Sequence, residues 1–190
     1  MRLLKLEKVK DGKYIKNYEL TYLNKTGREK TYEIVSRKEL NSIDDLGKKT
    51  SGVSIVATKE DKMLLLREFR MGINKKIYNL CAGMLEENET MEECIKRELY
   101  EETGLCVSKI KYILNPSYSA VGISDIKTQI AFVEVSGEFS DHTSDNESIE
   151  AAFYSANEIK TLLETEEFSS RAQLAAYHFM QIQFLKDNLK

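Results

Sequence analysis

The chain has 190 residues, of which 42% are hydrophobic and 31% are charged, and its formal net charge is -3. This length fits one domain of ordinary size, or one with a modest appendage, and the acidic balance argues against a basic surface for nucleic acids. The first residues contain no continuous apolar signal segment, and no run approaches the roughly 18 apolar residues of a membrane span. We therefore expect a cytoplasmic protein that binds neither nucleic acid nor a membrane.

Cysteine usage points to the same compartment. The three cysteines, Cys81, Cys94 and Cys106, are odd in number and lack the paired spacing of a metal site. Reduced thiols are the natural interpretation in a cytosolic chain.

The N-terminal region alternates apolar and polar residues in the pattern of β-strands. Tyr18, Leu20 and Tyr22 show this period of two, and Gly12 and residues 24–27 carry turn signals. The pattern predicts two or three antiparallel strands with little core of their own, which must rest on another part of the protein or on a second subunit. We expect residues 1–44 to form this β appendage, with a dimerisation role, and residues 45–190 to form the main domain.

The main domain alternates short apolar segments with helical ones. Residues 52–58 and 62–69 predict a hairpin of buried strands separated by a charged turn. Further along, the patterns predict strands over 107–114, 127–135 and 150–154, and helices over 156–163 and 169–189.

The stretch from Ala82 to Leu105 is the most informative part of the sequence. It carries eight glutamates against two basic residues. Thr90 followed by Glu93 is a capping-box signal, and Gly104 stands where a helix C-cap glycine is expected. These signals predict a helix over residues 91–103.

Glu98 and Glu102 lie one helical turn apart, within the apolar stripe of this helix. The stripe consists of Met91, Cys94, Ile95 and Leu99. Two carboxylates at this spacing repel each other, and burying an unpaired carboxylate costs several kcal/mol or forces it to take up a proton. A divalent cation between them would remove both objections, and oxygen ligands suit Mg²⁺ or Mn²⁺.

Arg97 lies one turn from Glu93 and one turn from Glu101. This spacing would let it hold the glutamate face in place. An ordinary surface ion pair with Glu93 is the alternative, and such a pair contributes well under ~1 kcal/mol.

At this point the residues match a family signature. Gly83, Glu89 and the run RELYEETGL, from Arg97 to Leu105, resemble a complete Nudix box. The resemblance implies an α/β/α Nudix sandwich with a mixed sheet, joined here to the N-terminal antiparallel strands. In that family the box holds Mg²⁺ and cleaves a nucleoside diphosphate linked to another moiety. The structural positions of the motif would be Gly83, Glu89, Arg97 and Gly104.

Other segments resemble the ADP-ribose pyrophosphatase branch of the family. Residues 145–149 are similar to a segment that supplies a metal ligand and a candidate general base in that branch, while Arg70, Asn79 and residues 117–125 match segments that bind substrate. The metal ligands would be the carbonyl of Ala82 with Glu98, Glu101, Glu102 and Glu147. The catalytic residues would be Glu98, Glu101, Glu102, Asp145 and Glu147. The substrate would contact Arg70 through its diphosphate, Asn79 through its base, and the loop residues Ser124 and Asp125.

Three of these positions depart from the branch. Asn79, Asp125 and Asp145 stand where a glutamate is usual, and the change at Asn79 leaves the base preference open. The identity of the general base also stays open among Asp145, Glu147 and Glu101.

The resemblance implies an Mg²⁺-dependent hydrolase, with Mn²⁺ possible, that splits a nucleoside diphosphate sugar into two monophosphates. ADP-ribose is the first choice, and a homodimer is expected through exchanged N-terminal strands. One alternative is a Nudix sensor that binds nucleotide sugars without cleaving them, against which the intact glutamates argue. Another is a MutT-like nucleoside triphosphate pyrophosphohydrolase, which the N-terminal appendage and the two loops disfavour.

Overall fold

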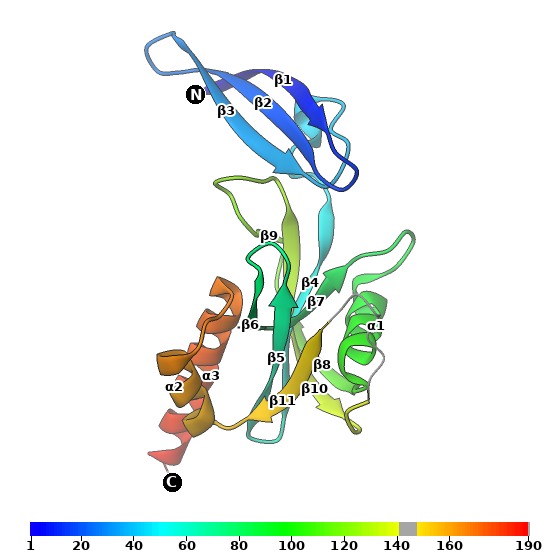
Figure 1. The fold of residues 1–190 in the computed structure, drawn as a ribbon, viewed down its shortest axis with the longest axis vertical. Helices are drawn as coiled ribbons and strands as arrows, with labels where there is room; N and C mark the ends of the chain where they lie inside the picture. The colour runs from blue at the N-terminus through cyan, green and yellow to red at the C-terminus, as the bar shows by residue number, and fades with distance from the viewer. Residues whose placement is uncertain (141–147, 190) are drawn as a thin grey trace. The chain divides into compact units, whose positions relative to one another are not determined.

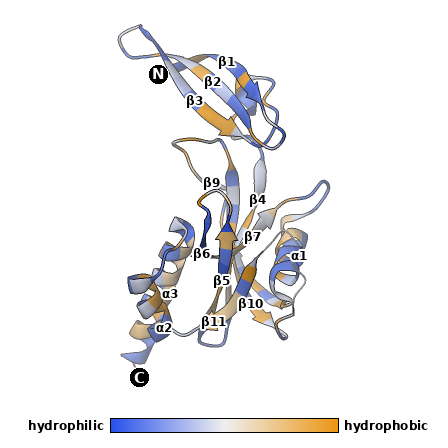
Figure 2. Cartoon of the chain, viewed as in Figure 1, coloured by the Kyte–Doolittle hydropathy of each residue, from blue (hydrophilic) through white to orange (hydrophobic). Residues whose placement is uncertain are grey.

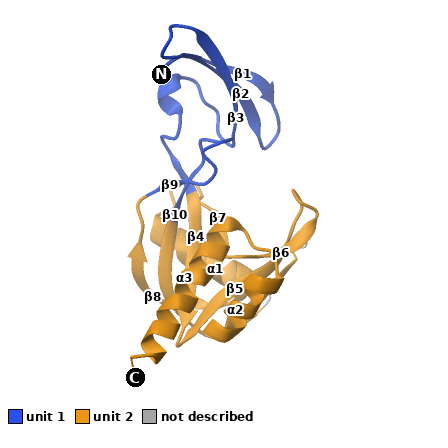
Figure 3. Ribbon diagram, turned by 90° about the vertical axis from the view of Figure 1, so that its left-hand side faces the viewer, with its two compact units in different colours: residues 1–51, 116–129 blue, residues 52–115, 130–190 orange. Residues whose placement is uncertain are grey.

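The computed structural model describes residues 1–140 and 148–189. The chain divides into two compact units, each built from two segments (Figure 3). Unit 1 contains residues 1–51 and 116–129, and unit 2 contains residues 52–115 and 130–190. Unit 1 therefore takes in more of the chain than the predicted appendage of residues 1–44.

Unit 1 is built on a three-stranded antiparallel sheet (Figure 1). The strands run in the order β1 (Arg2–Asp11), β2 (Lys16–Leu23) and β3 (Glu29–Ser36). Because side chains alternate across a strand, the apolar residues of β2 and β3 gather on one face. Tyr18, Leu20 and Ile34 of these strands form a small core with Leu40, which follows β3. The prediction of two or three antiparallel N-terminal strands is confirmed, and there are three.

A segment from the middle of the chain completes unit 1. It contains β9 (Ser117–Tyr118), which pairs with the start of β10 (Lys127–Ser136). Ser124 forms a parallel bridge with Val35 of β3, and the amide of Val35 donates to the carbonyl of Ile123 at 2.8 Å. A single 3₁₀ turn, η1 (Ile43–Asp45), follows the sheet.

The centre of unit 2 is a strongly apolar hairpin of β4 (Thr50–Lys59) and β5 (Lys62–Arg70). Their sheet has eight strands, with the path β11–β5–β4–β10–β8, to which β6 adds beside β5, β7 beside β4 and β9 beside β10. The remaining strands are β6 (Lys75–Asn79), β7 (Cys81–Met84), β8 (Cys106–Ile113) and β11 (Ile149–Tyr154). The predicted hairpin and the three predicted later strands are confirmed.

Alternation along β4 and β5 produces two cores, one on each face of the sheet. Leu64 and Leu66 join the core that contains Ile95 and Leu99 of α1 (Met91–Thr103). Their neighbours in β5 join the opposite core, under α2 (Ala156–Thr165) and α3 (Ser170–Asp187). Figure 2 shows the resulting mixture of hydrophobic and hydrophilic residues along the strands. The sheet is thus covered by α1 on one face and by α2 and α3 on the other.

These layers confirm the predicted α/β/α sandwich with a separate antiparallel N-terminal sheet. The three cysteines are free, as expected. Within residues 1–140 and 148–189, no helix is long and apolar enough to cross a membrane.

Candidate active site

Helix α1 begins and ends where the sequence predicts. The hydroxyl of Thr90 accepts a hydrogen bond from the amide of Glu93, and the Glu93 carboxylate accepts one from the amide of Thr90 at 2.9 Å. Gly104 ends the helix with a positive φ of 76°, a conformation that favours glycine. Glu93 is thereby used in the cap, and the alternative pairing with Arg97 is not found.

Arg97 is the centre of a compact ion-pair network. Its Nε and Nη2 atoms bind the two oxygens of Glu89 at 2.7 and 2.9 Å, and its Nη1 atom binds Glu98 at 2.9 Å and Glu101 at 3.1 Å. Nη2 also donates to the carbonyl of Met84 at 2.9 Å. The guanidinium lowers the pKa of Glu89 to about 2. Arg97 thus ties the loop before the helix to the acidic face of the helix.

The Glu98 carboxylate lies directly against the backbone of Gly83, in β7. A methyl group built on Gly83 would place its carbon 1.7 Å from Cδ of Glu98, so no other residue fits without moving this carboxylate. Burial raises the pKa of Glu98, although the hydrogen bond and charge of Arg97 oppose that effect. A glycine is therefore required at position 83 because the Glu98 carboxylate lies against its backbone, and not because the chain turns there.

Glu102 lies deeper than Glu98 and has no basic partner among the residues that the structure describes. One of its carboxylate oxygens accepts a hydrogen bond from the amide of Ala82 at 3.1 Å. Burial raises its pKa to about 8, and the negative charges of Glu68 and Glu98 contribute further. An ionised carboxylate here is costly unless a cation compensates it.

These donors fit a hard divalent cation. Glu98 and Glu102 supply carboxylate oxygens, and the backbone of Ala82 lies beside them. Among residues 1–140 and 148–189, however, no three His, Cys, Asp or Glu side chains converge closely enough to hold a metal by themselves. The ion would thus need further oxygens from water, substrate or other parts of the chain, as is usual for Mg²⁺.

Glu68 is a site residue that the sequence analysis missed. It is only 7% exposed, and it lies close enough to Glu102 to raise the pKa of that residue. The side-chain amide of Asn79 donates to its carboxylate, and Nη1 of Arg70 lies 3.4 Å from it. The signal was present, because Glu68 follows Leu64 and Leu66 at a period of two and so faces α1.

Arg70 and Asn79 flank this buried glutamate differently. The Arg70 side chain is 55% exposed, so its guanidinium touches Glu68 while much of it faces solvent. Both polar atoms of the Asn79 side chain form hydrogen bonds. Its nitrogen donates to Glu68, and its oxygen accepts from the hydroxyl of Ser169 at 2.6 Å. Asn79 therefore links the end of β6 to the start of α3 and positions Glu68.

The other predicted site residues are placed elsewhere or not described. Ser124 and Asp125 belong to unit 1, where Ser124 pairs with Val35 and the carboxylate of Asp125 accepts the amide of Gly47 at 3.3 Å. Asp145 and Glu147 lie outside the described residues. In unit 2 the structure brings together Gly83, Glu89, Arg97, Glu98, Glu101 and Glu102, with Ala82, Arg70 and Asn79 nearby in the chain and linked by the contacts above.

Strand β7, the loop that follows it and helix α1 together present a cluster of carboxylates. Such a cluster is typical of metal-dependent hydrolases that act on phosphate compounds. The family described as "NUDIX domain" matches residues 48–177 of this chain, which is more than half of it. The chain belongs to the Nudix hydrolase family. Enzymes of this family generally use divalent metal ions.

The chain is similar to curated proteins and to solved structures. The ADP-sugar pyrophosphatase of Mus musculus is 26% identical over 141 residues, covering 70% of this chain and 60% of the mouse protein. The NAD-capped RNA hydrolase NudC of Vibrio parahaemolyticus is 41% identical over 58 residues, covering 30% of this chain and 22% of that protein. A crystal structure of an ADP compounds hydrolase shares the fold, with a TM-score of 0.73 and 22% identity over 98% of this chain and 94% of the other. The chain thus spans about a fifth to three fifths of these curated relatives.

The contact between Gly83 and Glu98 leads to a first prediction. Gly83→Ala should displace the Glu98 carboxylate and reduce turnover roughly 10²-fold, because catalytic geometry tolerates little misplacement. Gly72→Ala is a matched control, since nothing lies within 4 Å of a methyl group added there. Steady-state kinetics and circular dichroism of both variants would check this. Normal activity in Gly83→Ala would contradict the close approach.

The buried Glu102 leads to a pH prediction for the metal-free chain. Between the ordinary value of 4.5 and the native value of about 8, the native state holds a proton that the unfolded state has lost. The free energy of unfolding should therefore fall as pH rises through this window. We expect Tm to decrease across it, and added Mg²⁺ to reverse the decrease by favouring the ionised carboxylate. Calorimetric Tm values in EDTA and in Mg²⁺ would measure both effects.

Glu102→Gln provides the control for this titration, because a neutral amide of similar size has no proton to release. Its metal-free Tm should vary much less with pH over the same window. If the metal-free Tm of the variant fell with pH as steeply as that of the parent chain, the pH dependence would belong to other groups.

Proposed function

We propose that this chain hydrolyses the diphosphate bond of a nucleoside diphosphate sugar, with ADP-ribose as the first choice, and releases two monophosphates. The observation that carries the proposal is the partly buried pair Glu98 and Glu102, held against β7 beside the Arg97 network. The similarity to a protein named ADP-sugar pyrophosphatase, over 70% of the chain, supports this substrate class.

The carboxylates would hold the cofactor, for which we propose Mg²⁺, with Mn²⁺ as the alternative. Glu98 and Glu102 are the main ligands in this proposal, joined by the carbonyl of Ala82 and by Glu101 and Glu147. When bound, the ion would neutralise diphosphate charge and lower the pKa of a coordinated water. Arg97 keeps Glu98 and Glu101 in fixed orientations through its hydrogen bonds.

Arg70 is suited to orient the diphosphate. Its guanidinium is anchored on one side by Glu68 and is otherwise half-exposed, so N–H groups remain for phosphate oxygens. Positioning and charge stabilisation of this kind supply much of the rate enhancement in phosphoryl transfer.

The proton acceptor for the attacking water is assigned to an acidic side chain, with Asp145, Glu147 and Glu101 as candidates. Glu101 is 53% exposed and is bound to Arg97 through one oxygen, so its other oxygen is accessible. We keep Ser124, Asp125 and Asn79 as proposed substrate contacts. The contact of Asn79 with Glu68 favours a positioning role over direct reading of the base.

The two alternatives are less well supported. A sensor that binds without cleavage has no need of Glu98 and Glu101 held by Arg97, with Glu102 on the same helix face. A MutT-like triphosphatase would favour nucleoside triphosphates over nucleotide sugars. The first experiment is therefore phosphate release, with Mg²⁺, from a panel of nucleotide sugars, dinucleotides and nucleoside triphosphates.

Removing one charge from the carboxylate pair tests the proposal directly. Glu98→Gln should lower turnover of the best substrate roughly 10²-fold or more, with little change in fold, because charge stabilisation is lost. Glu92→Gln is the matched control, since Glu92 is exposed on the same helix and is not part of the network. Initial rates of both variants with ADP-ribose measure the effect. Activity of Glu98→Gln close to that of the control would end the metal proposal.

We also propose a cytoplasmic homodimer formed through the N-terminal strands. Apolar side chains on β1 and at the following turn are exposed in the single chain, including Leu4, Val9 and Ile15. A dimer would cover such residues. Light scattering of the full chain should give twice the monomer mass of 21.9 kDa. A stable monomer at micromolar concentration would contradict the proposal.

A further inference from the structure

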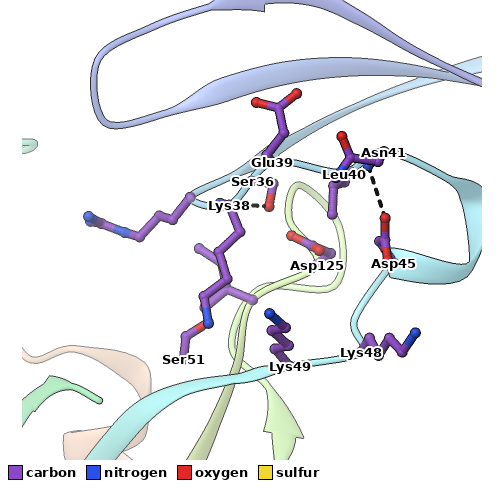
Figure 4. A pocket seen from close by; sticks show the side chains of 12 residues that line it. Ser36, Lys38, Glu39, Leu40, Asn41, Asp45, Lys48, Lys49, Ser51 and Asp125 are labelled. Atoms are coloured by element: carbon purple, nitrogen blue, oxygen red, sulfur yellow. Dashed lines mark hydrogen bonds between the residues drawn. The ribbon is translucent and has the colours of Figure 1, made fainter. Parts of the chain in front are cut away.

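Unit 1 contains a cavity of about 140 Å³ that the proposed hydrolysis does not use (Figure 4). Its walls come from residues 36–41, from residues 45–51 and from Asp125 and Ile126, all within unit 1. Four basic residues line it: Arg37, Lys38, Lys48 and Lys49. We propose that this cavity binds the phosphate group of a small anion.

The basic side chains around the cavity form no close ion pairs with the described residues, although Lys48 interacts with Asp45 at longer range. In the described part of the chain, none of the four has a carboxylate within the 4.0 Å of an ion pair, whereas Lys8 and Lys16 nearby are both paired. Figure 4 shows Lys38 and Lys49 extending into the space between the two walls, while Lys48 points away from it. Two ammonium groups therefore approach one small volume, and neither forms an ion pair within residues 1–140 and 148–189.

The acidic residues that line the same cavity are already engaged. Glu39 binds Lys8 at 2.9 Å, and its other oxygen lies 3.9 Å from Lys16. The carboxylate of Asp45 accepts the amides of Asn41 at 2.9 Å and Ser42 at 3.0 Å. That of Asp125 accepts the amide of Gly47 at 3.3 Å. These carboxylates hold the walls together, and no three acidic side chains among the described residues form a cation site.

Two buried serines add neutral donors to the walls. Ser36 is 2% exposed, and its oxygen accepts the amide of Lys38 at 3.2 Å, which leaves its own proton for another acceptor. Ser51 is 5% exposed, and its hydroxyl has no hydrogen-bond partner in residues 1–140 and 148–189. No fully enclosed side-chain oxygen in those residues lacks a partner, so the Ser51 hydroxyl keeps some exposure, and Ser51 lines the cavity. Phosphate oxygens are acceptors that both hydroxyls could reach from the cavity wall.

The size of the cavity limits the ligand. A volume of about 140 Å³ is similar to the ~150 Å³ cavity that holds one benzene molecule, and it is below the ~300 Å³ lower limit of typical sites for larger ligands. Inorganic phosphate or the phosphate of a monoester fits, whereas an entire nucleotide sugar does not. Asp125 lines the cavity, but none of the carboxylates on α1 does.

Calorimetric titration of inorganic phosphate into the full chain tests the proposal. EDTA is present, so that metal-assisted binding at the carboxylate site does not contribute. The parent chain should show one saturable site, and Lys38→Gln/Lys49→Gln should bind roughly ten-fold or more weakly, because charge-assisted hydrogen bonds are lost. Lys25→Gln/Lys30→Gln removes the same charge from exposed positions in the same unit and should bind as the parent does.

Two further variants distinguish binding in this cavity from binding elsewhere on the chain. Ser51→Ala keeps all charges, so its weaker binding would assign a hydroxyl donor to the site. Arg70→Gln should leave phosphate affinity unchanged, because Arg70 belongs to the diphosphate site of unit 2. Titration with AMP in the same variants distinguishes free phosphate from a monoester as the preferred ligand, and either preference supports the site.

Three results would overturn the proposal. They are the absence of saturable phosphate binding in the parent chain, unchanged affinity in the Lys38 and Lys49 double variant, and loss of binding in Arg70→Gln alone. Unfolding curves of every variant show whether a lost signal reflects a lost fold.

Discussion

The candidate active site depends on the five N–H donors of one guanidinium. Arg97 binds three carboxylates and one carbonyl, which is more than a lysine at this position could bind in a fixed geometry. Without it, Glu89, Glu98 and Glu101 would repel one another, and the loop from Met84 to Glu89 would have no charge-assisted contact with α1. The network thus permits a dense cluster of negative charge on one helix face.

Arg97 does not pair with Glu102, so the glutamates of this cluster differ in pKa. Glu102 has no contact with the guanidinium, and burial raises its pKa to about 8. Glu89 accepts two hydrogen bonds from Arg97, and its pKa is lowered to about 2. The pKa values of two carboxylates in one short motif are therefore shifted in opposite directions. One is fixed as a structural anion, and the other favours whichever cation replaces its proton. A site of this kind gives up some stability of the metal-free chain for function.

The sequence predicted the features that are set locally. Helix α1 has its cap at Thr90 and its end at Gly104 because both signals act within one turn of the helix. The β4–β5 hairpin follows from the apolar pattern of its own residues. Glu68 was missed because its importance comes from Asn79 and Glu102, which lie 11 and 34 positions further along the chain. The alternation along β5 places Glu68 on the face toward α1, but no local pattern shows which residues of other elements it will contact.

The assignment of residues 116–129 to unit 1 is another long-range result. In sequence, this segment follows the predicted box and resembles a loop that contacts substrate, but its backbone joins β3 through the Val35–Ser124 bridge. The same segment supplies Asp125 to the wall of the basic cavity and to the amide of Gly47. Any role of Ser124 and Asp125 toward substrate is therefore exerted from within the N-terminal unit. Changes in the packing of β3 would act on that role directly, because β3 and the segment share backbone hydrogen bonds.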